Sequence, residues 1–197
     1  KIWLASNEII VERDERGRTI TATEVKTGDA VKSGGITKMS KSKNNGVDPQ
    51  TAINKQGADT VRLFTMFAAP PEQTLEWSDE GVSGAHRFLR KLWKMVHDHL
   101  ETNGSVSLDI DNLNQKQQDL RRKTHETINK VNDDFGRRNT FNTAIAAVME
   151  LLNDVAKHNS AETQSVAVRH EALTSAVLLL SPIAPHICHA LWQALGH

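Results

Sequence analysis

Four lysines occur within a short segment rich in glycine, serine and asparagine that has no aspartate or glutamate from Val31 to Val47: Lys32, Lys38, Lys41 and Lys43. A segment of this composition cannot bury enough apolar surface to form part of a core. Lysine ammonium groups are compact charges that suit phosphate oxygens, and serine hydroxyls and free backbone N–H groups would add donors. Composition alone leaves two interpretations open, a solvated surface turn or a loop that closes on phosphate.

A second cationic pattern lies in a helix predicted after Ser78. Its members have the spacing i, i+3, i+4, i+7 and share one helix face, opposite Leu89 and Val96: Arg87, Arg90, Lys91 and Lys94. This basic stripe is either a solvated face, with Lys94 pairing with Asp98, or a surface for RNA phosphates. Weaker candidates of the same kind are Arg121, Arg122, Lys123, Arg137 and Arg138.

Two other groups of residues could carry chemistry. His186 and His189 flank Cys188, but no third ligand accompanies them, so no metal site is predicted. The tryptophans of the predicted helical region lie at helix starts or on apolar faces and are predicted to be core residues, not platforms for base stacking: Trp77, Trp93 and Trp192.

Composition narrows the class of protein. The 197 residues carry 24 basic and 24 acidic side chains, so attraction to nucleic acid must come from a local patch. The one cysteine excludes an internal disulfide and suits a reducing cytosol. No apolar run reaches transmembrane length. The chain begins at Lys1 without a signal peptide, and we expect it to be a piece of a longer protein.

The elements that position these side chains differ before and after the lysine-rich segment. Before it, an apolar β-branched run, a polar turn at 14–17 and alternation from Thr19 to Val25 predict a β-hairpin. After it, apolar residues recur at helical spacing. We expect a mainly α fold, an antiparallel helix bundle preceded by a small β-containing segment and a flexible loop.

Caps and breakers predict where the helices begin and end. Asp48 and Pro49 start a helix, Gly57 ends it, and Asp59 caps the next. Further predicted boundaries are a stop at Pro70 and Pro71, a cap at Ser78, a helix over about 113–135 ended by Gly136, and breaks at Pro182 and Pro185.

The literal order of the loop residues, Lys38-Met39-Ser40-Lys41-Ser42, matches the KMSKS signature loop of class I aminoacyl-tRNA synthetases. The wider stretch KMSKSKNNGVDP resembles the bacterial-type leucyl-tRNA synthetases in particular, because the valine and isoleucine enzymes typically continue with Gly-Asn-Val. The likeness runs from about Thr37 to the end of the chain, and further matching stretches are GADTVRLF at 57–64, EWSDEGVSGAHRFLRKLW at 76–93 and SPIAPHICHALW at 181–192.

The resemblance implies ATP-dependent activation of leucine and its transfer to tRNA(Leu). Lys41 first, and Lys38 second, would neutralise charge on the departing pyrophosphate. The implied ATP-binding set is Lys38, Met39, Ser40, Lys41 and Ser42, in which Met39 is expected to pack and the serines to contact phosphate or hold the loop. The implied tRNA-binding set is Arg87, Arg90, Lys91, Lys94, Arg137 and Arg138, acting on the tRNA backbone more than on its bases.

The resemblance also implies three regions. Residues 1–36 look like the end of the leucine-specific insertion, 37–77 hold the KMSKS loop and connecting helices, and 78–197 form the helical tRNA-binding bundle. The family's other ATP motif, His-x-Gly-His, is absent, as is the βαβ pattern of the nucleotide-binding fold, so the isolated chain is expected not to activate leucine. Mg²⁺ is expected only in the full-length enzyme, which should be a cytoplasmic monomer without membrane contact.

Two other interpretations stay open at this point. Within the enzyme class, the chain could come from a valyl- or isoleucyl-tRNA synthetase. Outside it, the chain could be a freestanding, non-catalytic RNA-binding helical module, although a lysine loop of the KMSKS type would then have no purpose.

Overall fold

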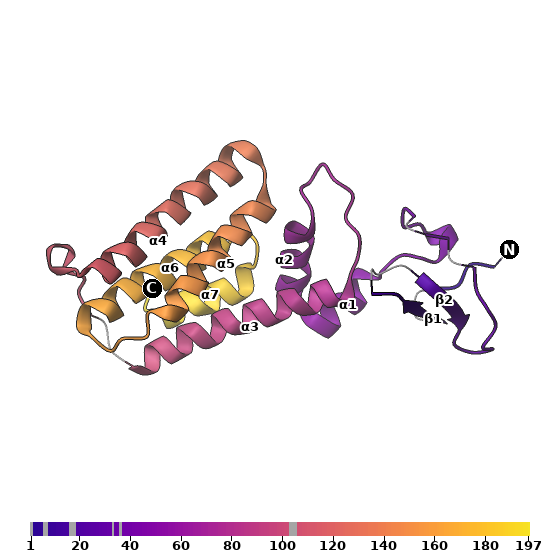
Figure 1. Ribbon diagram of the computed structural model, residues 1–197, viewed down its shortest axis with the longest axis horizontal. Helices are drawn as coiled ribbons and strands as arrows, with labels where there is room; N and C mark the ends of the chain where they lie inside the picture. Colours follow the sequence, from indigo (N-terminus) through magenta and orange to yellow (C-terminus); the bar gives the residue numbers. More distant parts are fainter. Residues whose placement is uncertain (1, 6–7, 16–18, 33, 36, 103–105) are drawn as a thin grey trace. The chain divides into compact units, whose positions relative to one another are not determined.

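A computed structural model describes residues 2–5, 8–15, 19–32, 34–35, 37–102 and 106–197 (Figure 1). The chain divides into two compact units, Lys1–Ala52 and Ile53–His197. The predicted boundaries after residues 36 and 77 remain predictions about functional regions.

The first unit contains the predicted β-hairpin. Strands β1 (Ile9–Arg13) and β2 (Thr19–Glu24) pair antiparallel, with Ile9 opposite Glu24 and an irregularity between Glu12 and Arg13. β-Branched residues in both strands favour this conformation. Of the predicted turn, residues 16–17 lie outside the described part of the chain.

The lysine loop and its exit form the rest of the first unit. A single 3₁₀ turn, η2 (Lys41–Lys43), is followed by α1 (Pro49–Gln56), which crosses the boundary between the units. The Asp48 carboxylate accepts hydrogen bonds from the Thr51 N–H at 2.8 Å and its hydroxyl at 2.6 Å, which confirms the predicted cap. These bonds lower the pKa of Asp48. Gly57 ends α1 with φ 85°, a conformation that favours glycine.

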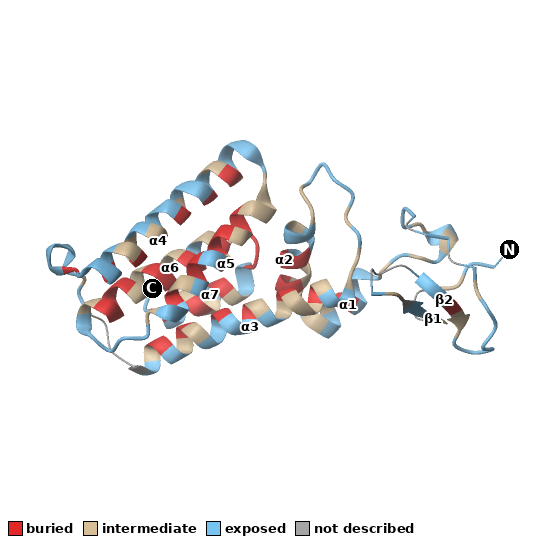
Figure 2. Ribbon diagram, viewed as in Figure 1, coloured by how far each residue is buried: buried red, intermediate tan, exposed pale blue. Residues whose placement is uncertain are grey.

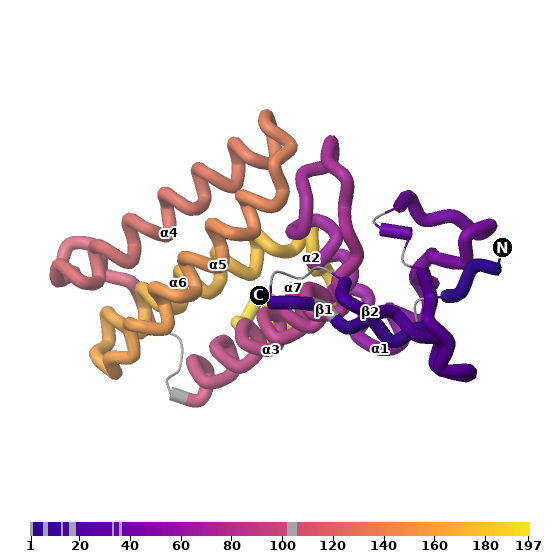
Figure 3. The backbone as a smooth tube through the Cα atoms, turned by 45° about the vertical axis from the view of Figure 1, so that its right-hand side comes forward, coloured from indigo at the N-terminus to yellow at the C-terminus, as the bar shows by residue number. Residues whose placement is uncertain are grey.

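The second unit is the predicted antiparallel bundle, and the mainly α fold class is confirmed. Its helices and short turns are α2 (Ala58–Ala68), α3 (Asp79–Thr102), η3 (Ile110–Asn112), α4 (Gln115–Asp133), η4 (Asp134–Arg138), α5 (Phe141–Lys157), α6 (Thr163–Leu180) and α7 (Pro185–Ala194). Helices α4, α5 and α6 lie side by side in both views, and α2, α3 and α7 pack beside them (Figures 1 and 3).

The core lies where these helices face one another. In Figure 2 the buried residues gather on the inward sides of α3, α5, α6 and α7. Leu92 on α3, Ile145 on α5, Leu173 on α6 and Leu191 on α7 are all fully buried. Helix α6 packs against α4, α5 and α7, and so it is apolar over most of its circumference.

Several predicted boundaries hold. Helix α2 ends just before Pro70, and the Ser78 hydroxyl accepts a hydrogen bond from the Gly81 N–H at 3.1 Å at the start of α3. Helix α4 begins two residues later than predicted because Asn114 and Gln117 form a reciprocal capping box.

Two boundary predictions are wrong. Asp59 does not cap α2: it lies inside the first turn, is buried, and binds α7 instead. Gly136 does not end the second long helix, since it lies within the π-helical turn η4, and Asn139 at φ 54° takes the left-handed position that closes the turn.

The prediction that Trp93 is a core residue is also wrong. Its side chain is 42% exposed, because it lies at the edge of the α3 apolar face and stacks on His97. Trp77 and Trp192 are half-buried and pack against the core. No helix among the described residues is long and apolar enough to cross a membrane.

Candidate functional site

The lysine loop is organised by one asparagine side chain. Asn45 Oδ1 accepts a hydrogen bond from the Ser40 N–H at 2.8 Å. Its Nδ2 donates to Thr37 Oγ1 at 3.1 Å and to the Lys38 carbonyl at 3.3 Å. Asn45 therefore holds the first half of the KMSKS sequence close to the residues that follow the sequence. Sequence reasoning used Asn45 only to distinguish leucine from valine and isoleucine enzymes, and missed this clamp.

The loop backbone turns tightly inside this clamp. The N–H groups of Lys43 and Asn44 donate to the carbonyls of Ser40 and Lys41, both at 3.2 Å, and Asn44 adopts φ 50°. The hydroxyl oxygens of Ser40 and Ser42 lie 3.3 Å apart. The two serines thus present adjacent hydroxyls from one turn.

The cationic side chains of the loop differ in their surroundings. Lys38 and Lys41 are exposed, and within the described residues neither has a carboxylate at ion-pair distance. Lys43 is half-buried, and its Nζ lies 6.0 Å from the centroid of the Trp3 ring. Met39, expected to pack, is 42% exposed. Two ammonium groups without a carboxylate partner in the described residues, Lys41 on the tight turn and Lys38 just before it, can receive an anion.

The basic stripe lies on the exposed side of α3, as its spacing predicts. Arg87 and Arg90 have no ion pair in the part of the chain that the structure describes. Lys91 donates to Asn153 Oδ1 at 2.8 Å. Lys94 binds both carboxylate oxygens of Asp98, at 2.7 and 2.8 Å, which raises the lysine's pKa. The N-terminal half of the stripe is therefore the part with unneutralised charge.

The weaker cationic candidates on α4 are neutralised by carboxylates. Arg121 pairs with Glu171 at 3.1 Å, Arg122 with Asp119 at 2.6 Å, and Lys123 with Glu150 at 3.1 Å. Phosphate binding there would have to compete with these ion pairs.

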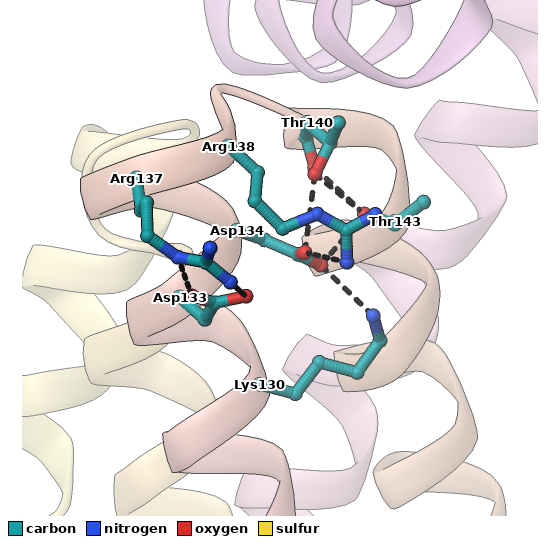
Figure 4. A network of polar contacts seen from close by, with 7 residues as sticks. All are labelled: Lys130, Asp133, Asp134, Arg137, Arg138, Thr140 and Thr143. Carbon is teal, nitrogen blue, oxygen red and sulfur yellow. Dashed lines mark hydrogen bonds and ion pairs between the residues drawn. The ribbon is translucent and has the colours of Figure 1, made fainter.

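Arg137 and Arg138 project from the π-helical turn beside two aspartates (Figure 4). Arg137 binds both carboxylate oxygens of Asp133, at 2.6 and 3.0 Å, and Arg138 NH1 lies 3.4 Å from Asp134. Both guanidinium groups are exposed, yet each already has an acidic partner. They are weaker anion sites than Arg87 and Arg90.

Asp134 is fully buried at the base of this turn, and sequence reasoning did not identify it. Its carboxylate accepts hydrogen bonds from Thr143 Oγ1 at 2.6 Å, Lys130 Nζ at 3.0 Å and Thr140 Oγ1 at 3.1 Å (Figure 4). Burial alone would raise its pKa, but these bonds outweigh burial and hold the pKa below its usual value. Asp134 therefore fixes the turn that carries Arg137 and Arg138.

The His186, Cys188 and His189 group does not form a shared site. His186 Nδ1 faces Asp59 at 2.8 Å, Cys188 points into the core, and His189 is exposed. Burial raises the pKa of the Cys188 thiol to about 12, with a smaller contribution from the Asp59 charge. Among the described residues, no three metal-ligating side chains gather.

Comparison with known families matches both parts of the chain. Residues 23–78 match the model for class I tRNA synthetases of the isoleucine, leucine, methionine and valine group. Residues 117–197 match the model for the anticodon-binding domain of tRNA ligases.

Curated relatives are leucine–tRNA ligases. The chain is 63% identical over 197 residues to the enzyme of Marinobacter nauticus and 60% identical over 197 residues to that of Chromohalobacter salexigens. The whole chain is covered in both cases, and it spans 23% of the length of each relative. These matches do not favour the valine, isoleucine or non-catalytic alternatives.

Solved structures agree with the sequence relatives. The leucyl-tRNA synthetase of Agrobacterium radiobacter K84, in a ternary complex with tRNA and LeuAMS, matches with a TM-score of 0.72 at 28% identity, covering 81% of this chain and 21% of its own. Methionyl-tRNA synthetase of Mycobacterium tuberculosis, at 20% identity and a TM-score of 0.67, covers 78% of this chain and 34% of its own and shares the fold. Over its whole length the chain is therefore similar to a segment of leucine–tRNA ligases, and its two parts match the class I tRNA synthetases and the anticodon-binding domain of tRNA ligases.

Proposed function

We propose that this chain supplies the phosphate-binding loop and a tRNA-binding helical unit to the ATP-dependent ligation of leucine to tRNA(Leu). The observation that carries the proposal is the KMSKS turn, clamped by Asn45, with Lys38 and Lys41 exposed and unneutralised within the described residues. Such a turn is a preorganised set of donors for an anion.

The loop residues have different proposed roles in the activation of leucine by ATP. In leucine activation the leucine carboxylate attacks the α-phosphorus of ATP, and the bond from that phosphorus to the bridging oxygen of pyrophosphate breaks. The electron pair leaves with pyrophosphate, so negative charge grows on the departing group. Lys41 and Lys38 would stabilise that charge, while Ser40 and Ser42 would donate to phosphate oxygens.

The loop does not fit a metal site of its own. Mg²⁺ prefers oxygen ligands, usually one or two carboxylates with phosphates and water. The sequence has no carboxylate from Val31 to Val47. Any Mg²⁺ that accompanies ATP would therefore be held by the nucleotide and by residues outside this loop.

The basic stripe is the proposed tRNA contact, with Arg87 and Arg90 as its main members. Their guanidinium groups, which lack an acidic partner in the described part of the chain, suit phosphate oxygens. Backbone phosphates carry most of the electrostatic affinity for RNA. Arg137 and Arg138 would contribute less because Asp133 and Asp134 already bind them.

The location and assembly of the whole protein are also proposed. A cytoplasmic location is consistent with the free, buried Cys188, and the whole protein is proposed to be a monomer. Light scattering of the purified full-length enzyme would test the monomer, and cell fractionation would test the location.

Replacing Lys41 tests the loop. In the full-length enzyme that contains this chain, Lys41→Ala should slow adenylate formation by about 100- to 1,000-fold, the usual loss for one preorganised donor. Leucine affinity should barely change because the interaction strengthens only as pyrophosphate departs. Single-turnover adenylate formation measures the effect.

The matched control is Lys43→Ala, since Lys43 lies on the same turn but faces Trp3. Only a small loss is expected there. An equal loss for the two variants would point to general charge in the loop, and a rate for Lys41→Ala within a few-fold of the parent would refute the assignment.

Replacing all four residues of the basic stripe with glutamine tests the tRNA contact. For each tRNA phosphate that the variant no longer neutralises, the slope of log affinity against log salt should flatten by about 0.7 to 0.9. Arg122→Gln with Lys123→Gln is the control, because these cations are paired with Asp119 and Glu150 and should leave the slope unchanged. If the slope of log affinity against log salt is unchanged in the variant with all four substitutions, the stripe is an ordinary solvated face that does not contact tRNA.

A further inference from the structure

A groove of about 540 Å³ opens on the helical unit where the start of α2, the middle of α3 and the start of α7 meet. Its walls are mainly apolar, and its volume is within the range of small-ligand sites. The lining includes Gly57, Ala58, Leu89, Arg90, Trp93 and Ile187. Among the described residues of the helical unit, Arg90 is the member of the basic stripe that lines this groove.

Trp93 forms one wall and is already ordered as a stacking platform. The His97 ring stacks on it at 4.4 Å between centroids and 23° between planes. His97 Nδ1 lies 2.9 Å from the Trp93 carbonyl oxygen, which holds the imidazole in place. A large aromatic side chain that is 42% exposed and held in this way offers a flat apolar surface at little entropic cost.

Along α3, His97 lies on the other side of Trp93 from the remaining groove residues of that helix. His97 lies one helical turn C-terminal to Trp93, whereas the other α3 residues of the groove, His86, Leu89 and Arg90, all lie N-terminal to it. Along the helix, the imidazole and these groove residues therefore lie on either side of Trp93. We expect a flat ring in the groove to stack on the indole face that His97 does not cover.

Among the polar side chains that line the groove, Gln56, Asp59, Thr60, His86, Arg90 and His186, two suit a nucleotide. Arg90 is exposed and has no ion pair within the described ranges, so its guanidinium can receive a phosphate. His186 turns its Nδ1 toward the buried Asp59 carboxylate at 2.8 Å, which leaves Nε2 to bond the edge of a ring.

We infer that the groove binds one unstacked base of the tRNA, with the base on Trp93 and its phosphate on Arg90. This inference deepens the proposed tRNA contact and rests on it. Charge complementarity favours a nucleotide as the occupant. An apolar peptide segment would contact the apolar walls but leave the Arg90 guanidinium without an anion, whereas a nucleotide would place its base on the walls and its phosphate on Arg90. Single-stranded bases are commonly bound by such aromatic platforms beside cations.

Trp93→Ala tests the inference in the full-length enzyme, with a tRNA(Leu) transcript as probe. Affinity should fall about 5- to 100-fold, the usual effect of removing one stacking platform. The slope of log affinity against log salt should stay that of the parent, because stacking releases no counterions. Trp93→Phe should retain most of the affinity.

Two more variants isolate the groove from general effects. Phe67→Ala removes another aromatic side chain of the same unit, 40% exposed and outside the groove, and should not change tRNA affinity. Ala58→Phe fills the groove without changing charge or Trp93, and should weaken binding as Trp93→Ala does. Circular dichroism checks that each variant is folded.

The outcomes separate this inference from the proposed function. If the fourfold stripe variant flattens the salt slope while Trp93→Ala binds like the parent, the groove is not a base site and the tRNA contact stands. If neither variant affects tRNA binding, both ideas are wrong. A loss of thermal stability in Trp93→Ala with unchanged tRNA affinity would give Trp93 a packing role alone, and would overturn the inference.

Discussion

Asp59 shows how a single side chain can join two helices that are far apart in the sequence. One oxygen of its carboxylate accepts a hydrogen bond from the Ile187 N–H at 2.7 Å, and the other lies 2.8 Å from His186 Nδ1. Ile187 is the third residue of α7, so its N–H has no partner within the helix. Asp59 on α2 therefore caps α7 from outside.

Asp59→Ala should lower the free energy of unfolding of the chain by about 1 to 3 kcal/mol, because it removes a helix cap and leaves a partly buried N–H without its acceptor. Urea unfolding followed by circular dichroism measures this change, and the m-value should stay the same.

Asp154→Ala is the matched control. It removes the exposed pair of Asp154 with Lys157, at 2.6 Å, and should cost no more than about 1 kcal/mol. Equal losses of unfolding free energy in the two variants would mean that Asp59 contributes no more to stability than an exposed aspartate.

At this scale, the sequence predicts residues whose role depends on their neighbours in the chain. Lys38 and Lys41 are predicted to bind phosphate because the KMSKS sequence is local, and this stays a prediction. Asp48 could be predicted because a cap acts within one turn. Asp59 could not, since its partners lie more than 120 residues away. The Asn45 clamp spans only a few residues, but asparagine side chains make such bonds in many loops, so composition carries no specific signal.

The π-helical turn η4 shows the same limit for elements. Gly136 in a polar run is a reasonable stop signal, but the chain continues because Asp134 binds Lys130, Thr140 and Thr143 across the turn. Most helices were predictable because apolar spacing records which face is buried. The side chains that bend or join helices depend on tertiary contacts that spacing does not record.

The exposed position of Trp93 is a related case. Its spacing places it at the edge of the α3 apolar face, where both burial and exposure are compatible with the pattern. Trp93 is exposed because it lines the groove between α2, α3 and α7, and this groove forms only when the helices pack.

Across the whole helical unit, a chain of polar groups links α3 to α6 inside the bundle. Arg169 Nε donates to His99 Nδ1 at 3.2 Å, which leaves Nε2 of a neutral His99 to donate to His170 Nδ1 at 3.2 Å. Arg169 NH1 also donates to the His158 carbonyl at 2.8 Å, and the charge of His197 acts on His170. His99 is 5% exposed, so it is held neutral between an arginine and a second histidine.

This arrangement should make the bundle sensitive to acid. Burial, with the charges of Arg169 and His170, lowers the pKa of His99 from 6.5 to about 4. Between these two values the unfolded chain binds the proton that the folded chain excludes, so stability falls as pH drops from 6.5 toward 4. The shift corresponds to a loss of up to about 3 kcal/mol.

His99→Gln should remove part of that sensitivity. Glutamine can accept from Arg169 and donate to His170 but does not titrate, so the urea midpoint of this variant should change less between pH 7.5 and 4.5 than that of the parent. His189→Gln, which replaces an exposed histidine of the same unit, should keep the parent's pH dependence. The Asp134 carboxylate also stabilises the fold, but because its pKa is held low, that contribution is lost only at lower pH. Asp134 is present in the parent and in both variants, so its effect is the same in all three proteins. If His99→Gln and the parent lose stability in parallel over this range, the acid response comes from other groups and the neutral His99 is not its source.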